Sequence, residues 1–158
     1  MKIVTIIPAR MNSSRFPGKP LKKIGKFTMI EHCYNRSKLA KKVDLTYVAT
    51  CDSKIYEHCL KKKINVVMTS KKHNRASDRV AEALLKIEKK LNKVFDVIMM
   101  LQGDEPMITP LMLDKLIEKF VKSKTGVANL ICKITKKEEI LDSNEIKVVK
   151  NLSNNALY

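Results

Sequence analysis

The feature that most constrains the fold is an alternation between short, β-branched apolar runs and longer segments with helical periodicity. The first run, at 3–7, reads IVTII, which is typical of a strand buried on both faces of a sheet. Similar runs follow at 45–50, 66–69, 95–101 and 127–134. Helical patterns occur at about 29–39, 53–62, 77–91, 110–120 and 136–141. This alternation predicts an α/β protein with a predominantly parallel sheet and helices on both faces, a three-layer αβα, Rossmann-like arrangement.

Length and composition exclude several classes of protein. The chain has 158 residues, of which 44% are hydrophobic, enough for one domain with a buried core. No apolar run reaches the roughly 18 residues of a membrane span, and the short segment before Pro8 lacks the features of a secretory signal. We therefore expect a cytoplasmic protein without a membrane partner. The pairs His32-Cys33 and His58-Cys59 fall in helical patterns, and we expect these cysteines to be core residues rather than metal ligands.

The charge balance is strongly basic, with 32 Lys and Arg against 16 Asp and Glu and a net charge of +16. Such a surplus can indicate a nucleic-acid partner. The cations here are mostly lysines spread along the chain, however, while aromatic residues make up 5% and Trp is absent. Nucleic-acid readers concentrate Arg and aromatic side chains, so we expect a solvated basic surface and no nucleic-acid partner. The positive field still favours an anionic substrate.

The loop after the first predicted strand carries the most unusual composition. It contains Arg10, Arg15 and Lys19, together with a Pro-Gly pair that ends at Gly18. Forked and point-charge donors on a tight turn suit a phosphate-binding loop. The loop is not a Walker motif, because Pro20 stands where Ser or Thr is required. A solvated basic loop is the alternative interpretation.

A second candidate site follows the apolar run at 95–101. Asp104 comes directly after that predicted strand, and ligands of parallel sheets bind beyond the carboxyl ends of the strands. A carboxylate oxygen there is the kind of ligand that Mg²⁺ prefers. The alternative is that residues 102–106 form only a turn before the next helix.

Several stretches resemble one known family. They read IPARMNSSRFPGKPL at 7–21, YVAT at 47–50, HNRASDR at 73–79 and LQGDEP at 101–106. In this order and spacing they resemble the signature of sugar nucleotidyltransferases, in particular the 3-deoxy-manno-octulosonate (Kdo) cytidylyltransferase family. The resemblance spans all 158 residues. It implies a nucleotide-diphospho-sugar transferase-like fold and transfer of a cytidylyl group from CTP to the anomeric hydroxyl of a sugar acid, with release of pyrophosphate and Mg²⁺ as cofactor.

The resemblance also implies roles for individual residues. Arg10 and Lys19 would contact the triphosphate with help from Arg15, and Asp104 would bind Mg²⁺. Further residues would line the nucleotide pocket, namely Pro8, Ala9, Gln102 and Gly103. The weaker candidates are Ser77 and Arg79, and Arg79 would pair with the carboxylate of the sugar acid.

This sequence departs from the family pattern at two places. Ala76-Ser77 stands where Gly-Thr is common, and a required positive φ at that glycine would strain Ala76. Cys51 stands where an acidic residue is common, and we expect that change to be neutral.

Members of the resembled family continue beyond the segment that matches 156–158. We therefore expect residues 1–158 to be a nucleotide-binding domain that is incomplete at its C-terminal end, without the portion that supplies a second metal carboxylate and much of a homodimer interface. Three hypotheses follow: an enzyme of lipopolysaccharide synthesis that activates Kdo, its 8-amino variant or a nonulosonic acid; a nucleotide-binding module without activity; and, least favoured, a nucleic-acid-binding protein. Pyrophosphate release from CTP separates the first two hypotheses, and salt-sensitive DNA binding tests the third.

Overall fold

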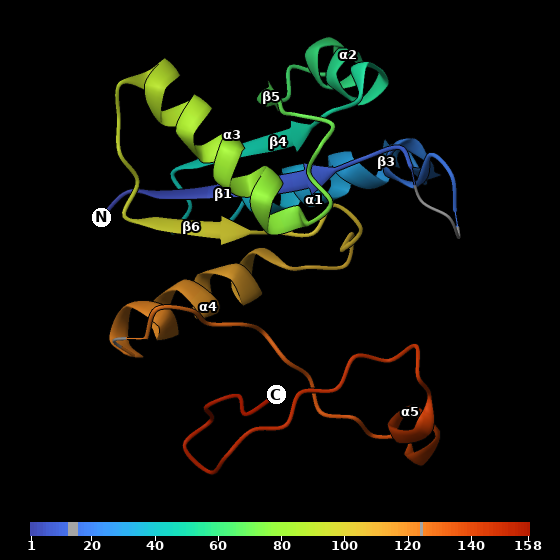
Figure 1. Cartoon of the computed structure of the whole chain (residues 1–158), viewed down its shortest axis with the longest axis vertical. Helices are drawn as coiled ribbons and strands as arrows, with labels where there is room; N and C mark the ends of the chain where they lie inside the picture. The colour runs from blue at the N-terminus through green and yellow to red at the C-terminus, as the bar shows by residue number, and fades with distance from the viewer. Residues whose placement is uncertain (13–15, 124) are drawn as a thin grey trace.

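The computed structural model describes residues 1–12, 16–123 and 125–158. Its main sheet has the order β5-β4-β1-β6, and every pair of neighbouring strands is parallel (Figure 1). The strands are β1 (Ile3–Ala9), β4 (Leu45–Thr50), β5 (Val66–Met68) and β6 (Val97–Met100). The predicted parallel sheet is confirmed, with strand ends that differ by a few residues from the predicted ranges.

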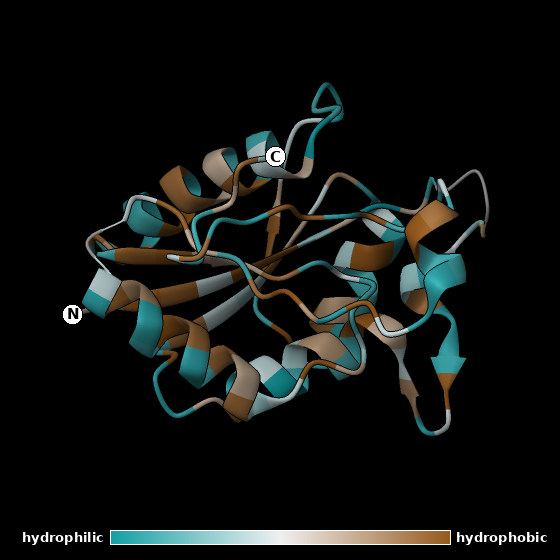
Figure 2. Cartoon of the chain, turned by 90° about the horizontal axis from the view of Figure 1, so that it is seen from below, coloured by the Kyte–Doolittle hydropathy of each residue, from teal (hydrophilic) through white to brown (hydrophobic). Residues whose placement is uncertain are grey.

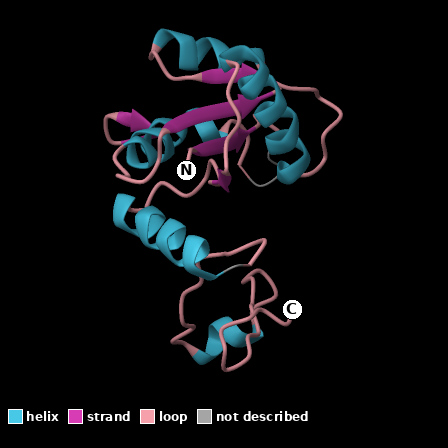
Figure 3. Ribbon diagram, turned by 90° about the vertical axis from the view of Figure 1, so that its left-hand side faces the viewer, coloured by secondary structure: helices cyan, strands magenta, loops and turns pink. Residues whose placement is uncertain are grey.

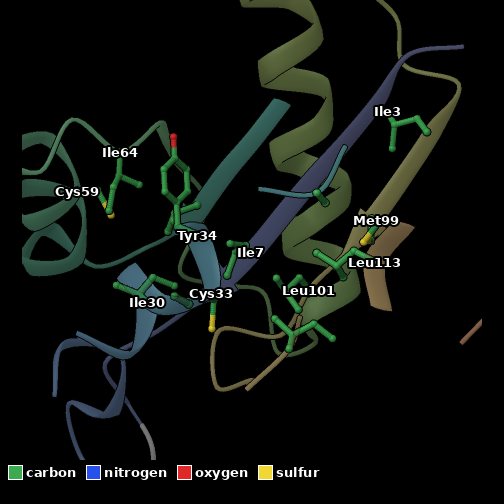
Figure 4. Close-up of a cluster of buried hydrophobic side chains, with 14 of the residues drawn as sticks. Ile3, Ile7, Ile30, Cys33, Tyr34, Cys59, Ile64, Met99, Leu101 and Leu113 are labelled. Atoms are coloured by element: carbon green, nitrogen blue, oxygen red, sulfur yellow. The ribbon is translucent and has the colours of Figure 1, made fainter. Parts of the chain in front are cut away.

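The central strand β1 is buried on both faces, as its composition predicts. All seven of its residues are buried, and alternate side chains enter two separate apolar clusters. Ile3 and Ile7 pack into a cluster with residues from three helices (Figure 4), which are α1 (Met29–Lys38), α2 (Ser53–Lys61) and α4 (Pro110–Ser123). Val4 and Ile6 pack on the opposite face against α3 (Ala76–Leu91). The three-layer αβα arrangement is therefore confirmed, and Figure 2 shows the mostly apolar strands between helices above and below.

The two His-Cys pairs contribute their cysteines to the core, as expected. Cys33 and Cys59 are fully buried in the cluster that covers one face of the sheet. Burial raises the pKa of the Cys33 thiol to about 11 and that of Cys59 to about 12. Both thiols are therefore protonated packing groups at neutral pH.

The segment between β1 and α1 contains regular structure that the sequence did not predict. It includes a short 3₁₀ helix, η1 (Lys19–Leu21), and a two-stranded hairpin of β2 (Lys23–Ile24) and β3 (Phe27–Thr28). Gly25 makes the tight turn of this hairpin possible, because its φ of 61° is one that glycine adopts without strain. The hairpin leads into α1, which begins with a capping box between Thr28 and Glu31.

The predicted strand at 127–134 is wrong. These residues form no strand, and Val127, Leu130 and Ile131 are exposed. The stretch lies beyond α4, on the side away from the sheet (Figures 1 and 3), so a β-branched sequence finds no ladder to complete. The helix predicted at 136–141 is present as α5 (Lys137–Leu141). Near the C-terminus a short antiparallel bridge joins Lys150 to Ala156.

No helix within the described residues is long and apolar enough to cross a membrane.

Candidate active site

A cleft of about 610 Å³ lies beyond the carboxyl ends of β1 and β6 and beside the start of α3. This is the edge of a parallel sheet where ligands are expected. Described residues from three parts of the chain that are far apart in the sequence line the cleft; they fall within 8–12 and 16–20, within 73–79, and within 102–104. Among the described residues that line the cleft, four side chains are cationic and one is a carboxylate, a net charge of +3; these side chains are Arg10, Lys19, Arg75, Arg79 and Asp104.

The first wall is the loop that follows β1. Its base is closed by the Gly18 amide, which donates to the carbonyl of Met11 at 3.1 Å. Gly18 has a φ of 72°, in the left-handed region that glycine adopts without strain. Arg10 directly precedes Met11 and Lys19 directly follows Gly18, so the two cations flank this hydrogen bond. Both side chains line the cleft.

Lys19 and Asp104 meet across the cleft although 85 residues separate them in the sequence. The Lys19 Nζ atom donates to Asp104 Oδ2 at 2.8 Å. Solvent reaches 32% of the lysine side chain and 51% of the aspartate side chain, so the pair remains accessible to a ligand. The phosphate-loop cation and the proposed metal ligand therefore lie at one site.

The segment after β6 packs tightly against the end of β1. A Cβ atom on Gly103 would lie 2.9 Å from the carbonyl oxygen of Pro8 and 3.3 Å from Cδ1 of Ile30. Only glycine allows this approach without a shift of the backbone. Gly103 thereby sets the position of its neighbours Gln102 and Asp104, which line the cleft with it.

The third wall is the start of α3. Residues 74–76 line the cleft at the N-terminus of this helix, where unpaired backbone amides and the helix dipole favour an anion. Ala76 is the first helical residue and has no positive φ. The backbone strain that a positive φ would have caused at Ala76 is therefore absent.

Arg79 lies in the same wall, but its guanidinium is hydrogen-bonded within the protein. Its guanidinium Nη1 donates to the hydroxyl of Thr69 and to the carbonyl of Ser70. The residue is 4% exposed. Arg79 thus ties the loop after β5 to α3, and its predicted pairing with a sugar carboxylate stays a prediction.

Glu82 holds the same loop from the next turn of α3. Its carboxylate accepts a hydrogen bond from Lys86 at 2.7 Å, one from the Ser70 amide at 2.9 Å and a short one from His73. The Lys86 bond, followed by the Ser70 and His73 bonds, outweighs burial and lowers the pKa of Glu82 to about 2. The loop that positions His73 at the cleft is therefore held by an ionised carboxylate.

The structure places most of the predicted site residues together. Eight of them line the cleft, namely Pro8, Ala9, Arg10, Lys19, Arg79, Gln102, Gly103 and Asp104. Ser77 does not, because it is exposed on the first turn of α3 while Ala76 and Arg79, three residues apart, share the side that faces the cleft. Arg15 lies outside the described residues. Their roles in binding or catalysis stay predictions.

Sequence reasoning missed His73 and Arg75 as lining residues. Both fall in the stretch that carries the family resemblance, and Arg75 is one of only five arginines in the chain. The scarcity of Arg was the available signal, since a lysine-rich chain uses Arg where a forked donor is needed.

Asp104 fits a magnesium site of the open kind. Within the described part of the chain, no group of three or more His, Cys, Asp or Glu side chains could hold a metal ion. Mg²⁺ does not require such a group, because it commonly binds one or two carboxylates and completes its shell with waters and substrate phosphates. The exposed carboxylate of Asp104, beside a cation predicted to bind phosphate, matches that donor set.

Fold and site together define an α/β protein with a cationic cleft at the carboxyl edge of a parallel sheet. The family model of cytidylyltransferases matches residues 4–158. The chain therefore belongs to the cytidylyltransferase family.

Individual relatives and solved structures agree with this assignment. The chain is 41% identical to a 3-deoxy-manno-octulosonate cytidylyltransferase of Fusobacterium nucleatum, over 100% of this chain and 62% of the relative. It is 39% identical to an 8-amino-3,8-dideoxy-manno-octulosonate cytidylyltransferase of Shewanella sediminis, over 100% of this chain and 64% of the relative. A solved CMP:2-keto-3-deoxy-manno-octonic acid synthetase complexed with CTP superimposes with a TM-score of 0.89 at 35% identity, covering 100% of this chain and 63% of that one. The chain thus spans somewhat less than two thirds of the length of these proteins.

Proposed function

We propose that this chain provides the nucleotide-binding part of an enzyme that transfers a cytidylyl group from CTP to the anomeric hydroxyl of Kdo or a related sugar acid. The observation that carries the proposal is the contact of Lys19 with Asp104 at 2.8 Å inside a cleft of net positive charge. This contact supports the proposal because Lys19 would donate hydrogen bonds to phosphate and Asp104 would bind the metal ion at the same point. Relatives named for Kdo and for its 8-amino variant support the choice of sugar acid.

In the proposed reaction the anomeric hydroxyl oxygen attacks the α-phosphorus of CTP. A new bond forms between this oxygen and the α-phosphorus, the bond from that phosphorus to the oxygen bridging to the β-phosphate breaks, pyrophosphate leaves with the electron pair, and the hydroxyl proton passes to solvent. Negative charge builds on the phosphate oxygens, and catalysis consists of positioning and charge stabilisation. Arg10 and Lys19 would donate to these oxygens, and the N-terminus of α3 would add backbone donors.

Asp104 would hold Mg²⁺, and the bound ion would supply a Lewis acid that neutralises phosphate charge. Before nucleotide arrives, Asp104 and Lys19 neutralise each other. A nucleotide would give each partner a new contact, phosphate oxygen for Lys19 and a divalent ion for Asp104. Gln102 and Gly103, in the same wall as Asp104, would line the nucleotide pocket.

The test is titration of the chain with CTP and Mg²⁺, using three variants. Lys19→Met removes a charged hydrogen-bond donor and should weaken CTP binding roughly 10- to 100-fold, because bonds to charged groups contribute about 1.5–3 kcal/mol. Asp104→Asn should abolish the Mg²⁺ dependence of binding while leaving the fold intact. Lys119→Met is the matched control, since Lys119 is exposed on α4 and does not line the cleft. Equal affinities for all three variants would refute the proposed site.

Turnover is measured separately, as pyrophosphate release with Kdo, 8-amino-Kdo or a nonulosonic acid as acceptor. Release with one acceptor identifies the sugar acid. CTP binding without release from any acceptor would favour the nucleotide-binding module without activity over an enzyme.

The expected setting of this activity is the cytoplasm, as part of lipopolysaccharide synthesis. A homodimer is the expected assembly of full-length relatives, and sedimentation of this chain tests whether it dimerises. Nucleic acid is not a proposed partner, and DNA binding that persists in Asp104→Asn and ignores CTP would revive that alternative.

A further inference from the structure

The residue that precedes α2 does not perform the role that its position predicts. Asp52 occupies the N-cap position of α2, and its side chain makes no hydrogen bond to the helix. Aspartate is among the strongest N-cap residues, because its carboxylate usually accepts from a backbone amide in the first turn. A carboxylate at this position that does not bond the helix amides can accept a hydrogen bond from another part of the chain.

The partner of Asp52 is the loop that follows β1. Its Oδ2 atom accepts a hydrogen bond from the Met11 amide at 2.8 Å, and the Cys51 thiol lies 3.7 Å from the same oxygen. Met11 is also the residue whose carbonyl accepts from the Gly18 amide at 3.1 Å. Asp52 therefore holds Met11, whose hydrogen bond to Gly18 closes the base of the loop between Arg10 and Lys19.

The backbone of Asp52 is anchored to the buried end of β4. The Asp52 amide donates to the hydroxyl of Thr50 at 3.1 Å, and Thr50 is fully buried at the end of β4. Thr50 is also the register partner of Ala9 at the end of β1. The bond from Asp52 to Met11 thus continues the pairing of β4 with β1 beyond the point where the strands end.

We propose that Asp52 is a positioning residue for the nucleotide site, which fixes the loop so that Arg10 and Lys19 face the same ligand. The proposal rests on the proposed function for its consequence, but the bracing of the loop stands on geometry alone. A loop held in its binding conformation before the ligand arrives loses less entropy on binding.

The charge of Asp52 allows positioning to be separated from electrostatics. A carboxylate near a cationic cleft repels an anionic ligand, so its removal by itself should strengthen CTP binding. Loss of positioning should weaken CTP binding. The two effects have opposite signs.

Two substitutions separate bracing from helix capping. Asp52→Asn keeps the shape and a carbonyl oxygen that can accept from Met11, and Asn is also a good N-cap residue. Asp52→Ser keeps the N-cap preference but is too short to reach Met11. A residue needed only for α2 would therefore be replaced equally well by Asn and by Ser.

The first readout is amide hydrogen exchange without nucleotide. Exchange of the Met11 amide should rise roughly tenfold or more in Asp52→Ser and less in Asp52→Asn, because the lost bond is charge-assisted. The Tyr56 amide, which donates to the Asp52 carbonyl at 3.0 Å, should keep its exchange rate in both variants. Unchanged exchange at Met11 in Asp52→Ser would overturn the brace.

The second readout is the affinity for CTP with Mg²⁺. It should fall about threefold to tenfold in Asp52→Ser and should stay equal or rise slightly in Asp52→Asn. Faster Met11 exchange with unchanged or tighter CTP binding in Asp52→Ser would overturn the positioning role. If the unsubstituted chain does not bind CTP, the proposed function and the positioning role fail together, while Met11 exchange still decides whether Asp52 braces the loop.

Discussion

Neutralising Glu82 should destabilise the fold by an amount that depends on pH in a defined way. In Glu82→Gln the side chain keeps its length and can still accept from the Ser70 amide, so the variant removes the charge and little volume. The charge matters because Lys86 and His73 both bond the carboxylate. The substitution therefore tests whether an ionised group holds the wall of the cleft.

The magnitude follows from the pKa of Glu82, which falls from its ordinary value of 4.5 to about 2. At about 1.4 kcal/mol for each pKa unit, the ionised form stabilises the folded chain by at most roughly 3 kcal/mol. Solvent reaches 24% of the side chain, and screening should reduce this to about 2 kcal/mol. Because the folded pKa is depressed, this stabilisation is complete above about pH 4.5, falls to roughly half near pH 3 and disappears below pH 2.

The assay is urea unfolding of the unsubstituted chain and of Glu82→Gln between pH 7 and pH 3. The difference in the free energy of unfolding should be about 2 kcal/mol at pH 7 and should shrink as the pH falls below 4.5. Glu118→Gln is the control, because Glu118 forms the same kind of i,i+4 pair with Lys122 on an exposed face. Its effect on stability should not be resolvable. A Glu82→Gln difference that stays constant with pH would refute the reasoning, since packing and not charge would then explain it.

Three further substitutions test the fold around the site. Gly103→Ala should lower the free energy of unfolding by about 1–3 kcal/mol, because the new Cβ atom would lie 2.9 Å from the carbonyl oxygen of Pro8. It should also lower the affinity for CTP. Urea unfolding and CTP titration that both match the unsubstituted chain would contradict the close approach. Thr28→Ala should cost about 1 kcal/mol of stability by removing the cap of α1, and an unchanged unfolding midpoint would show that the capping box is dispensable. Leu113→Ala should cost about 2–5 kcal/mol because Leu113 is 2% exposed, whereas Leu111→Ala, at a residue 61% exposed, should leave thermal unfolding almost unchanged.

The parallel sheet could be predicted because each of its strands carries its own burial signal. The residues of β1 are apolar or β-branched on both faces, and this composition suits only a strand covered by helices on two sides. The cleft could be predicted for a related reason. The ends of parallel strands meet at one edge, and Arg10 and Asp104 each follow such an end, so the strand pattern predicts that they lie near each other.

Contacts that depend on which partner lies within reach in the folded chain could not be predicted. Asp52 reads as a helix cap, and only the position of Met11 shows that its carboxylate goes elsewhere. The strand predicted at 127–134 is wrong for a related reason, because its formation depends on a neighbour elsewhere in the fold. Its β-branched residues favour an extended backbone, but a strand also needs a neighbour with free backbone groups, and sequence pattern does not report whether such a neighbour is within reach.

The contact of Lys19 with Asp104 contributes little to stability and fits the proposed ligand site. Both side chains are partly exposed, and an exposed pair contributes at most about 1 kcal/mol to folding. A weak pair is easily separated by a ligand that brings charges of both signs. A nucleoside triphosphate with its divalent ion, the ligand proposed above, would be such a ligand, because it would offer an anion to Lys19 and a cation to Asp104 at the same time.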